Sequence, residues 1–180
     1  MMMELHQIQL SYQAEEDRIL CRTSFKGDDG GLQEVRAWLT RRMVKGLWPT
    51  ILGAMERQVA LDKPQAAHAS SDIVGMEHHA SIDAIRDSGS FDSPYDSEVA
   101  TLPLGSTPIL VTTVNFTMNV GEPIRMDFRP SEGSGVEIAL PSQILHGFCS
   151  LLKDAVAKAE WDMDLSLPGS LAASGPKVLN

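Results

Sequence analysis

The chain has 180 residues and a formal net charge of −9, with 43% hydrophobic and 22% charged residues. This composition is that of an average globular domain, and it excludes wholesale disorder and a coiled coil. No apolar run reaches the ~18 residues that would span a bilayer, and the first residues lack the basic and apolar regions of a secretory signal. We therefore expect a cytoplasmic protein with no membrane partner.

Residues 1–60 are predicted to form three antiparallel strands followed by a helix. Apolar and polar side chains alternate in three runs separated by acidic or glycine-rich turns, a pattern typical of half-buried strands. The runs are Ile8–Tyr12, Ile19–Phe25 and Val35–Leu39. Thr40 then suits the N-cap of a helix whose apolar residues recur at helical spacing as far as about Ala60, with Pro49 inside it.

Residues 61–104 form a connector that carries most of the acidity of the chain. It contains eight acidic and two basic residues, a net charge of −6. Ser71 and Asp72 can start a short helix within it, and residues 88–97 have the composition of a loop. The sequence leaves open whether the connector packs on the rest of the molecule.

Residues 105–164 repeat the plan of the first unit. Alternating runs occur at Val114–Met118, Ile124–Phe128 and Val136–Leu140. A helix is predicted to follow from Ser142 to about Trp161. Residues 165–180 are rich in glycine, proline and serine, and we predict a flexible tail there.

The two units align without a gap when residue numbers are shifted by 101, the interval from Val35 to Val136. Over residues 35–55 this shift pairs identical residues at four positions and apolar residues at six more. Amphipathic periodicity accounts for part of the agreement, but it does not predict a glycine at the same place in each helix, Gly46 and Gly147. We predict an α+β fold of two duplicated, pseudo-symmetric βββα units, in which antiparallel sheets are each backed by a long amphipathic helix. The acidic connector would join the units, and they would share one core.

The paired glycines suggest a close contact. A glycine inside a helix costs about 1 kcal/mol relative to alanine, and the approach of another backbone would offset that cost. Our hypothesis is that the two helices cross each other, or each abut a sheet, at Gly46 and Gly147. A Gly46→Leu substitution should then destabilise the fold.

Three cations occupy the first turns of the first predicted helix, namely Arg41, Arg42 and Lys45. Positive charge there opposes the helix dipole, which invites either an anion or an acidic partner. The equivalent positions of the second unit are uncharged, so the fold does not require these cations. The alternative is internal pairing with acidic residues of the turns or of the connector.

The polar faces of the predicted strands carry further arginines and one tryptophan, which define a candidate face for single-stranded nucleic acid. These residues are Arg18, Arg22, Arg36, Trp38, Arg125 and Arg129. Arginines could follow a phosphate backbone while an aromatic ring stacks on bases. The alternative is a solvated sheet face with cross-strand ion pairs, which suits the interleaved acids and the negative net charge better.

The loop at 88–97 combines aromatic and acidic residues, with Phe91, Asp92, Tyr95 and Asp96 set among serines. Such a segment is typical of a docking site for a protein partner. Equally, its aromatic side chains could hold the connector against the domain.

Catalytic and metal-binding patterns are weak. His68, Glu77, His78, His79 and Asp83 are the densest group of metal-capable side chains. Adjacent histidines on a helix diverge by about 100°, so we predict no metal and no cofactor. Neither a phosphate-binding loop nor a nucleophile motif is present.

The two cysteines, Cys21 and Cys149, each lie within an apolar pattern. We interpret both as buried thiols of a reduced protein, although Cys149 lies three residues from His146. We therefore expect a protein that is not an enzyme.

These observations lead to a functional hypothesis. We expect a non-catalytic binding or adaptor protein that engages a protein partner through the connector loop or an exposed sheet, with homodimerisation as a further option. The alternative is a protein that binds single-stranded nucleic acid through the strand arginines and the start of the first helix. A small-anion sensor or enzyme at that helix start is the third class.

Overall fold

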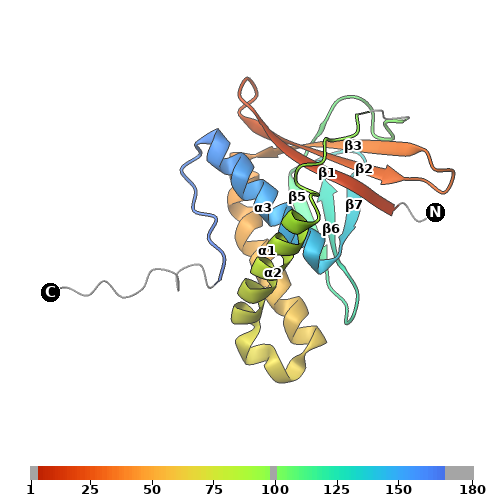
Figure 1. Cartoon of the computed structure of the whole chain (residues 1–180). Coiled ribbons are helices and arrows are strands. Elements are labelled where there is room, and N and C mark those ends of the chain that lie inside the picture. Colours follow the sequence, from red (N-terminus) through yellow and green to blue (C-terminus); the bar gives the residue numbers. More distant parts are fainter. Residues whose placement is uncertain (1–3, 98–100, 169–180) are drawn as a thin grey trace.

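The computed structural model describes residues 4–97 and 101–168 (Figure 1). Within these ranges the fold is α+β, with two sheets, three α-helices and a short 3₁₀-helix, and a helix follows each group of strands. The elements are β1 (Glu4–Gln13), β2 (Arg18–Lys26), β3 (Leu32–Thr40), α1 (Arg41–Asp62), η1 (Pro64–Ala69), α2 (Ser70–Asp87), β4 (Ile109–Leu110), β5 (Thr113–Thr117), β6 (Ile124–Arg129), β7 (Val136–Leu140) and α3 (Ser142–Ala159).

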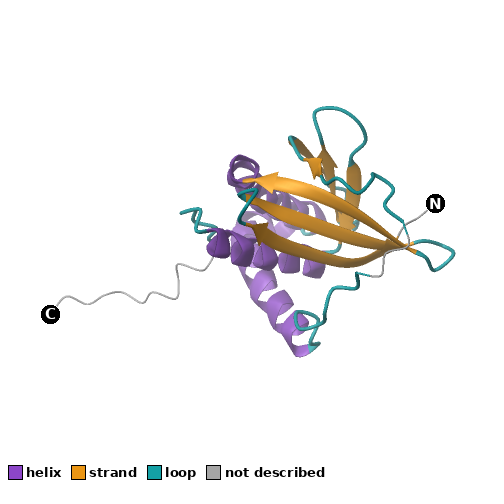
Figure 2. Cartoon of the chain, turned by 90° about the horizontal axis from the view of Figure 1, so that it is seen from above, coloured by secondary structure: helices purple, strands orange, loops and turns teal. Residues whose placement is uncertain are grey.

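The first sheet has the strand order β1-β2-β3-β4. The three long strands are antiparallel, as the alternating runs predict, and they lie side by side in Figure 2. The fourth strand, β4, is a two-residue strand that pairs in parallel with β3, so the expectation of a three-stranded antiparallel sheet is wrong here. A strand of two residues leaves no periodic pattern from which it could be predicted.

The second sheet has the order β5-β6-β7 and is antiparallel throughout, as predicted. The turns between its strands use glycine for a physical reason. Gly133 has a φ of +88°, a conformation that favours glycine. A Cβ atom on Gly135 would lie 2.2 Å from the carbonyl oxygen of Phe128, so no larger residue fits there without a backbone shift.

Helix α1 begins where the sequence indicates. The Thr40 hydroxyl accepts a hydrogen bond of 3.1 Å from the backbone N–H of Met43, which is the expected N-cap contact. The far end of α1 contacts the second sheet instead of the first. Gln58 donates to the carbonyl of Asn119, and the Asp62 carboxylate accepts from the N–H of Gly121 in the turn between β5 and β6.

The connector is more structured than predicted. Its helix is not short, because α2 has 18 residues and contacts both α1 and α3. Val74 and Ile85 of α2 are buried among the other helices. The three α-helices thus gather on one side of the molecule and the two sheets on the other (Figures 1 and 2).

A single hydrophobic core joins both units. Buried side chains from all three helices and from both sheets belong to it. Leu165 and Leu167, at the start of the predicted tail, are part of this core, and the Trp48 indole N–H donates to the carbonyl of Ser166. Residues 169–180 of that tail lie outside the described residues.

The hypothesis about the helical glycines is wrong for Gly46. This residue is exposed, and a Cβ atom there would meet nothing within 4 Å. At Gly147 a Cβ atom would lie 2.9 Å from Cδ1 of Ile85, so the close neighbour is a side chain of α2, not a sheet or α1. The two glycines therefore have different surroundings.

Among the residues described, no helix is both long and apolar enough to cross a membrane.

Candidate functional site

A groove of about 1000 Å³ lies where β1, β7, α3 and the loop after α2 meet. We call it the β1–α3 groove. Gln143, Ile144, Gly147, Phe148 and Leu151 of α3 form one wall. Residues 4–10 of β1 form another, and Glu137 and Ala139 of β7 also line it.

Strand β1 borders this groove with its edge. Side chains of a strand alternate between two faces, so a pocket above one face would be lined by every second residue. All seven residues from Glu4 to Leu10 line the groove, which places the strand edge there. This edge is free within the described residues, because β1 pairs only with β2.

The groove is apolar at its base and acidic at its sides. Five large hydrophobic side chains are exposed in the described residues, and two of them, Phe91 and Ile144, line the groove with 37% and 38% of their surface exposed. Glu4 and Glu137 are its only acidic lining residues, and no lysine or arginine lines it. An exposed apolar surface next to charged side chains is typical of an interaction site.

The segment 88–97, which we call the strap, forms the remaining wall. Its Phe91 lines the groove, and its later residues contact the outer face of the first sheet. The side-chain amide of Gln7 donates to the carbonyl of Pro94 at 3.2 Å and accepts from the N–H of Asp96 at 2.9 Å. The strap therefore bonds to a side chain of β1.

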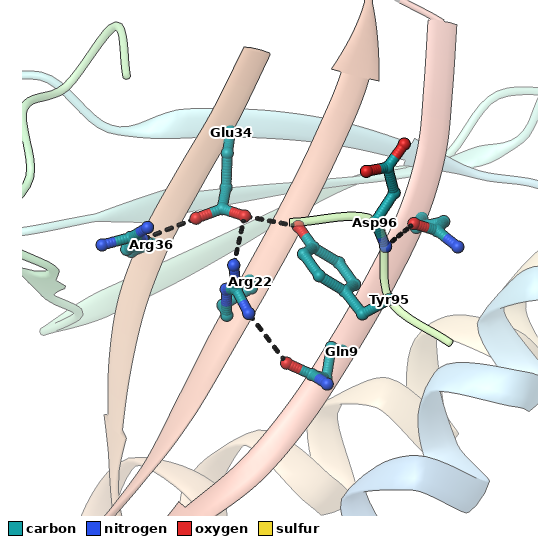
Figure 3. Close-up of polar contacts among 7 residues, drawn as sticks. Gln9, Arg22, Glu34, Arg36, Tyr95 and Asp96 are labelled. Carbon is teal, nitrogen blue, oxygen red and sulfur yellow. Dashed lines mark hydrogen bonds and ion pairs between the residues drawn. The ribbon is translucent and has the colours of Figure 1, made fainter. Parts of the chain in front are cut away.

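Tyr95 fixes the strap to the sheet (Figure 3). Its hydroxyl donates a hydrogen bond of 2.8 Å to Oε2 of Glu34 on β3, and the guanidinium of Arg22 lies 4.3 Å from the centre of its ring. Burial, followed by the hydrogen bond to Glu34, raises the pKa of Tyr95 above its usual range. The phenol thus stays protonated and remains a donor at physiological pH.

Glu34 is the centre of this network. Its side chain is fully buried and binds Arg22 at 2.9 Å and Arg36 at 2.5 Å as well as Tyr95. Burial alone would raise the pKa of Glu34, but the hydrogen bonds from Arg36, Tyr95 and Arg22 outweigh it and lower the pKa. A charged carboxylate with three donors is stable without solvent, so this cluster holds the strap in place.

A second polar contact links α2 to α3 behind the groove. Nδ1 of His78 and Nδ1 of His146 lie 3.2 Å apart, and both side chains are buried. One ring must donate and the other accept, so at least one is neutral when the bond is formed. The pKa of each histidine is lowered to about 4, by burial for His146 and by burial followed by the charges of His146, Lys153 and His79 for His78.

A smaller groove of about 510 Å³ lies where α1 meets β4 and β5. Six of its lining residues belong to α1 or its N-cap, and each corresponds to a lining residue of the β1–α3 groove at the shift of 101. The pairs are Thr40 and Pro141, Arg42 and Gln143, Met43 and Ile144, Gly46 and Gly147, Leu47 and Phe148, and Thr50 and Leu151. Each helix thus borders the first strand of the other unit.

The predicted anion site is exposed on the first turns of α1. Arg41, Arg42 and Lys45 form no ion pair with any residue that the structure describes. Arg41 is nevertheless near an acid of the turn after β1, because the pKa of Asp17 is lowered by hydrogen bonds from Trp161 and Tyr12 and also by the charge of Arg41. Only Arg42 of the three lines a groove, the smaller one.

The predicted nucleic-acid face is divided between the two sheets. Arg18, Arg22, Arg36 and Trp38 come from β2 and β3, whereas Arg125 and Arg129 come from β6. Four of these arginines are engaged in ion pairs, with Glu34 for Arg22 and Arg36, Glu122 for Arg125, and Asp127 for Arg129. Only the Arg22–Glu34 pair joins two strands; Arg36 and Arg129 each pair with an acid of their own strand, and Arg125 pairs with the turn before β6.

The predicted docking residues lie in two environments. Asp92 is exposed, and Phe91 and Tyr95 both line the groove. Tyr95 is also half-buried in the Glu34 network, and Asp96 binds Gln7 through its N–H. The strap therefore both contacts the sheet and presents an aromatic ring to the groove.

The metal-capable residues do not converge. Among the described residues, no three histidine, cysteine, aspartate or glutamate side chains are placed to hold a metal ion. Cys21 and Cys149 are buried, and burial raises the pKa of Cys21 to about 11 and that of Cys149 to about 12. Both thiols are thus protonated at neutral pH.

No family model, curated protein or solved structure matches this chain.

Sequence reasoning did not identify the groove, the Glu34 network or the histidine pair. Glu34 gives a signal in retrospect, because it is an acid on the same strand face as Arg36 and next to Arg22 across the sheet. The other two features join segments far apart in the sequence, and no local pattern marks such a contact.

Proposed function

We propose that this protein is a non-catalytic binding or adaptor protein, and that it engages a protein partner in the β1–α3 groove. The observation that supports this is that two exposed large hydrophobic side chains, Phe91 and Ile144, both line this groove. An apolar pocket with a polar rim provides most of the binding energy at protein interfaces.

The strap has a defined part in this proposal. Its Tyr95 is fixed to Glu34 on the first sheet, and four residues earlier its Phe91 borders the groove. Holding the strap in one position reduces the conformational entropy lost when a partner binds. We therefore assign Tyr95 and Glu34 a positioning role and Phe91 a contact role.

Site-specific photocrosslinking tests this function. An Ile144→p-benzoylphenylalanine variant, irradiated in cells of the source organism, should form a covalent adduct with a distinct polypeptide. The same replacement at Val120, which is 68% exposed and lies in the turn after β5, is the matched control. The proposal is contradicted if both positions give the same adducts, if Ile144 gives none, or if its only adduct is a second copy of this chain or nucleic acid.

We also infer that the two strand-and-helix units arose by duplication. The one-to-one correspondence of the helix residues that line the two grooves supports this, because it relates tertiary positions that amphipathic periodicity does not control. The reciprocal packing of each helix against the other unit is a second argument. Sequences of relatives test it, since the resemblance between the two halves should increase towards the deeper branches of the family.

A further inference from the structure

The charge of the β1–α3 groove indicates what kind of segment it can bind. Neither Glu4 nor Glu137 forms an ion pair or a side-chain hydrogen bond with any residue that the structure describes, and no lysine or arginine lines the groove, although His6 does. The nearest basic influence on Glu137 is Arg129, whose pKa is raised mainly by Asp127 and to a smaller extent by Glu137. An apolar ligand with positive charge would satisfy both features of the groove, whereas an acidic ligand would be repelled.

The free edge of β1 indicates the conformation of that segment. On the side away from β2, the backbone groups of β1 have no strand partner among the described residues, and the strap binds the side chain of Gln7 instead of this edge. An exposed strand edge binds extended peptides by adding a strand, while neighbouring pockets receive alternate side chains. Residues 4–10 extend for about 20 Å, which matches a segment of about six residues.

We propose that the partner enters the groove as an extended segment with apolar side chains and at least one lysine or arginine, paired along the edge of β1. This inference rests on the proposed function and specifies the partner. Ile144 and Phe91 would contact the apolar side chains, and Glu4 and Glu137 would receive the cation.

The smaller groove offers a contrast within the same molecule. Arg42 is the only charged residue that lines the smaller groove, and no carboxylate lines that groove. A basic segment is therefore expected to bind the β1–α3 groove and not the smaller one, although the two share equivalent helix positions.

Selection from a phage-displayed library of random 12-residue peptides, on the full chain, tests the charge and apolar character. Enriched peptides should combine apolar β-forming residues with lysine or arginine. A fluorescein-labelled enriched peptide should lose at least tenfold in affinity for the Glu4→Lys/Glu137→Lys variant, and a peptide with glutamate in place of its basic residue should regain it. The Asp72→Lys/Asp154→Lys variant, changed by the same charge on exposed helix positions, is the control.

N-methylation of the same peptide tests strand addition. Methyl groups at alternate amides should abolish binding in one register and have little effect in the other, because only every second amide of an added strand faces β1. The inference would be overturned if the selection enriched acidic peptides or none, or if the peptide bound both double variants equally. It would also be overturned if methylation in the two registers had equal effects. A partner crosslinked at Ile144 with no preference for basic segments would leave the proposed function standing, whereas no crosslinked partner contradicts both.

Discussion

Acid should destabilise this protein through the His78–His146 pair before any carboxylate becomes involved. Both rings are buried, and burial lowers the pKa of each to about 4 from an ordinary value of 6.5. The unfolded chain therefore takes up protons at a higher pH than the folded chain does. The stability associated with the neutral pair is complete above pH 6.5 and is lost as the pH falls from 6.5 towards 4.

The size of the effect follows from these values. A histidine with a pKa of 6.5 when unfolded and about 4 when folded loses about 2 to 3 kcal/mol of folding free energy between pH 7.5 and pH 4.5. The two rings share one hydrogen bond of 3.2 Å, so their protonations are not independent. We expect a loss of about 3 to 5 kcal/mol for the pair. Carboxylates with lowered pKa values, such as that of Glu34, lose their contribution only below this window.

Urea unfolding between pH 7.5 and pH 4.5, followed by tryptophan fluorescence, measures this loss. The His78→Leu/His146→Leu variant replaces both partners by apolar groups and should have nearly constant stability over the same range. A His68→Asn variant removes an exposed histidine of η1 that does not act on this pair, and it should retain the wild-type profile. Parallel profiles for the wild type and the double variant would refute the assignment of acid sensitivity to this pair.

Three further predictions concern the core and the strap. Glu34→Gln should lower the free energy of unfolding by about 2 to 3 kcal/mol, because two guanidinium groups lose a charged partner. Tyr95→Phe should lower it by only about 1 kcal/mol, because one hydrogen bond is lost. Urea unfolding of the two variants measures both values. Gly46→Ala should stabilise the protein by about 0.5 to 1 kcal/mol, since the new methyl group meets nothing within 4 Å, and a lower melting temperature would contradict this. Cys21 and Cys149 should react with a thiol reagent at least ~100-fold more slowly in the native protein than in urea, and rapid native labelling would disprove their burial.

Local patterns predict those parts of the fold whose periodicity is strong. The long strands, the N-cap at Thr40 and the helices after each strand group were all predictable, because alternation and helical spacing report directly on which face is buried. Strand β4 and the full length of α2 were not. The first is two residues long. The second has only four buried residues, of which Val74 and Ile85 alone are large and apolar, so its periodic signal is sparse.

Side-chain placement was harder to predict than secondary structure. Glu34 was expected on a solvated face, but the strap covers it and turns a surface ion pair into a buried network. The paired glycines were expected to mark equivalent contacts, yet only Gly147 has a close neighbour. In each case the deciding residue lies on the connector, and no pattern within the strands or helices specifies where a connector packs.

The connector also explains why two grooves with equivalent helix residues differ. On the proposed duplication, the original grooves were alike, and the segment between the units was free to cover one of them. Helix α2 packs against Gly147 through Ile85 and the strap adds Phe91 to the β1–α3 groove, while Gly46 in the smaller groove has no such neighbour. The connector thus contributes lining residues to the β1–α3 groove, and it contributes none to the smaller groove. A partner specific for one groove is then a direct consequence of where the connector lies, and the charge difference between Arg42 and Gln143 adds to it.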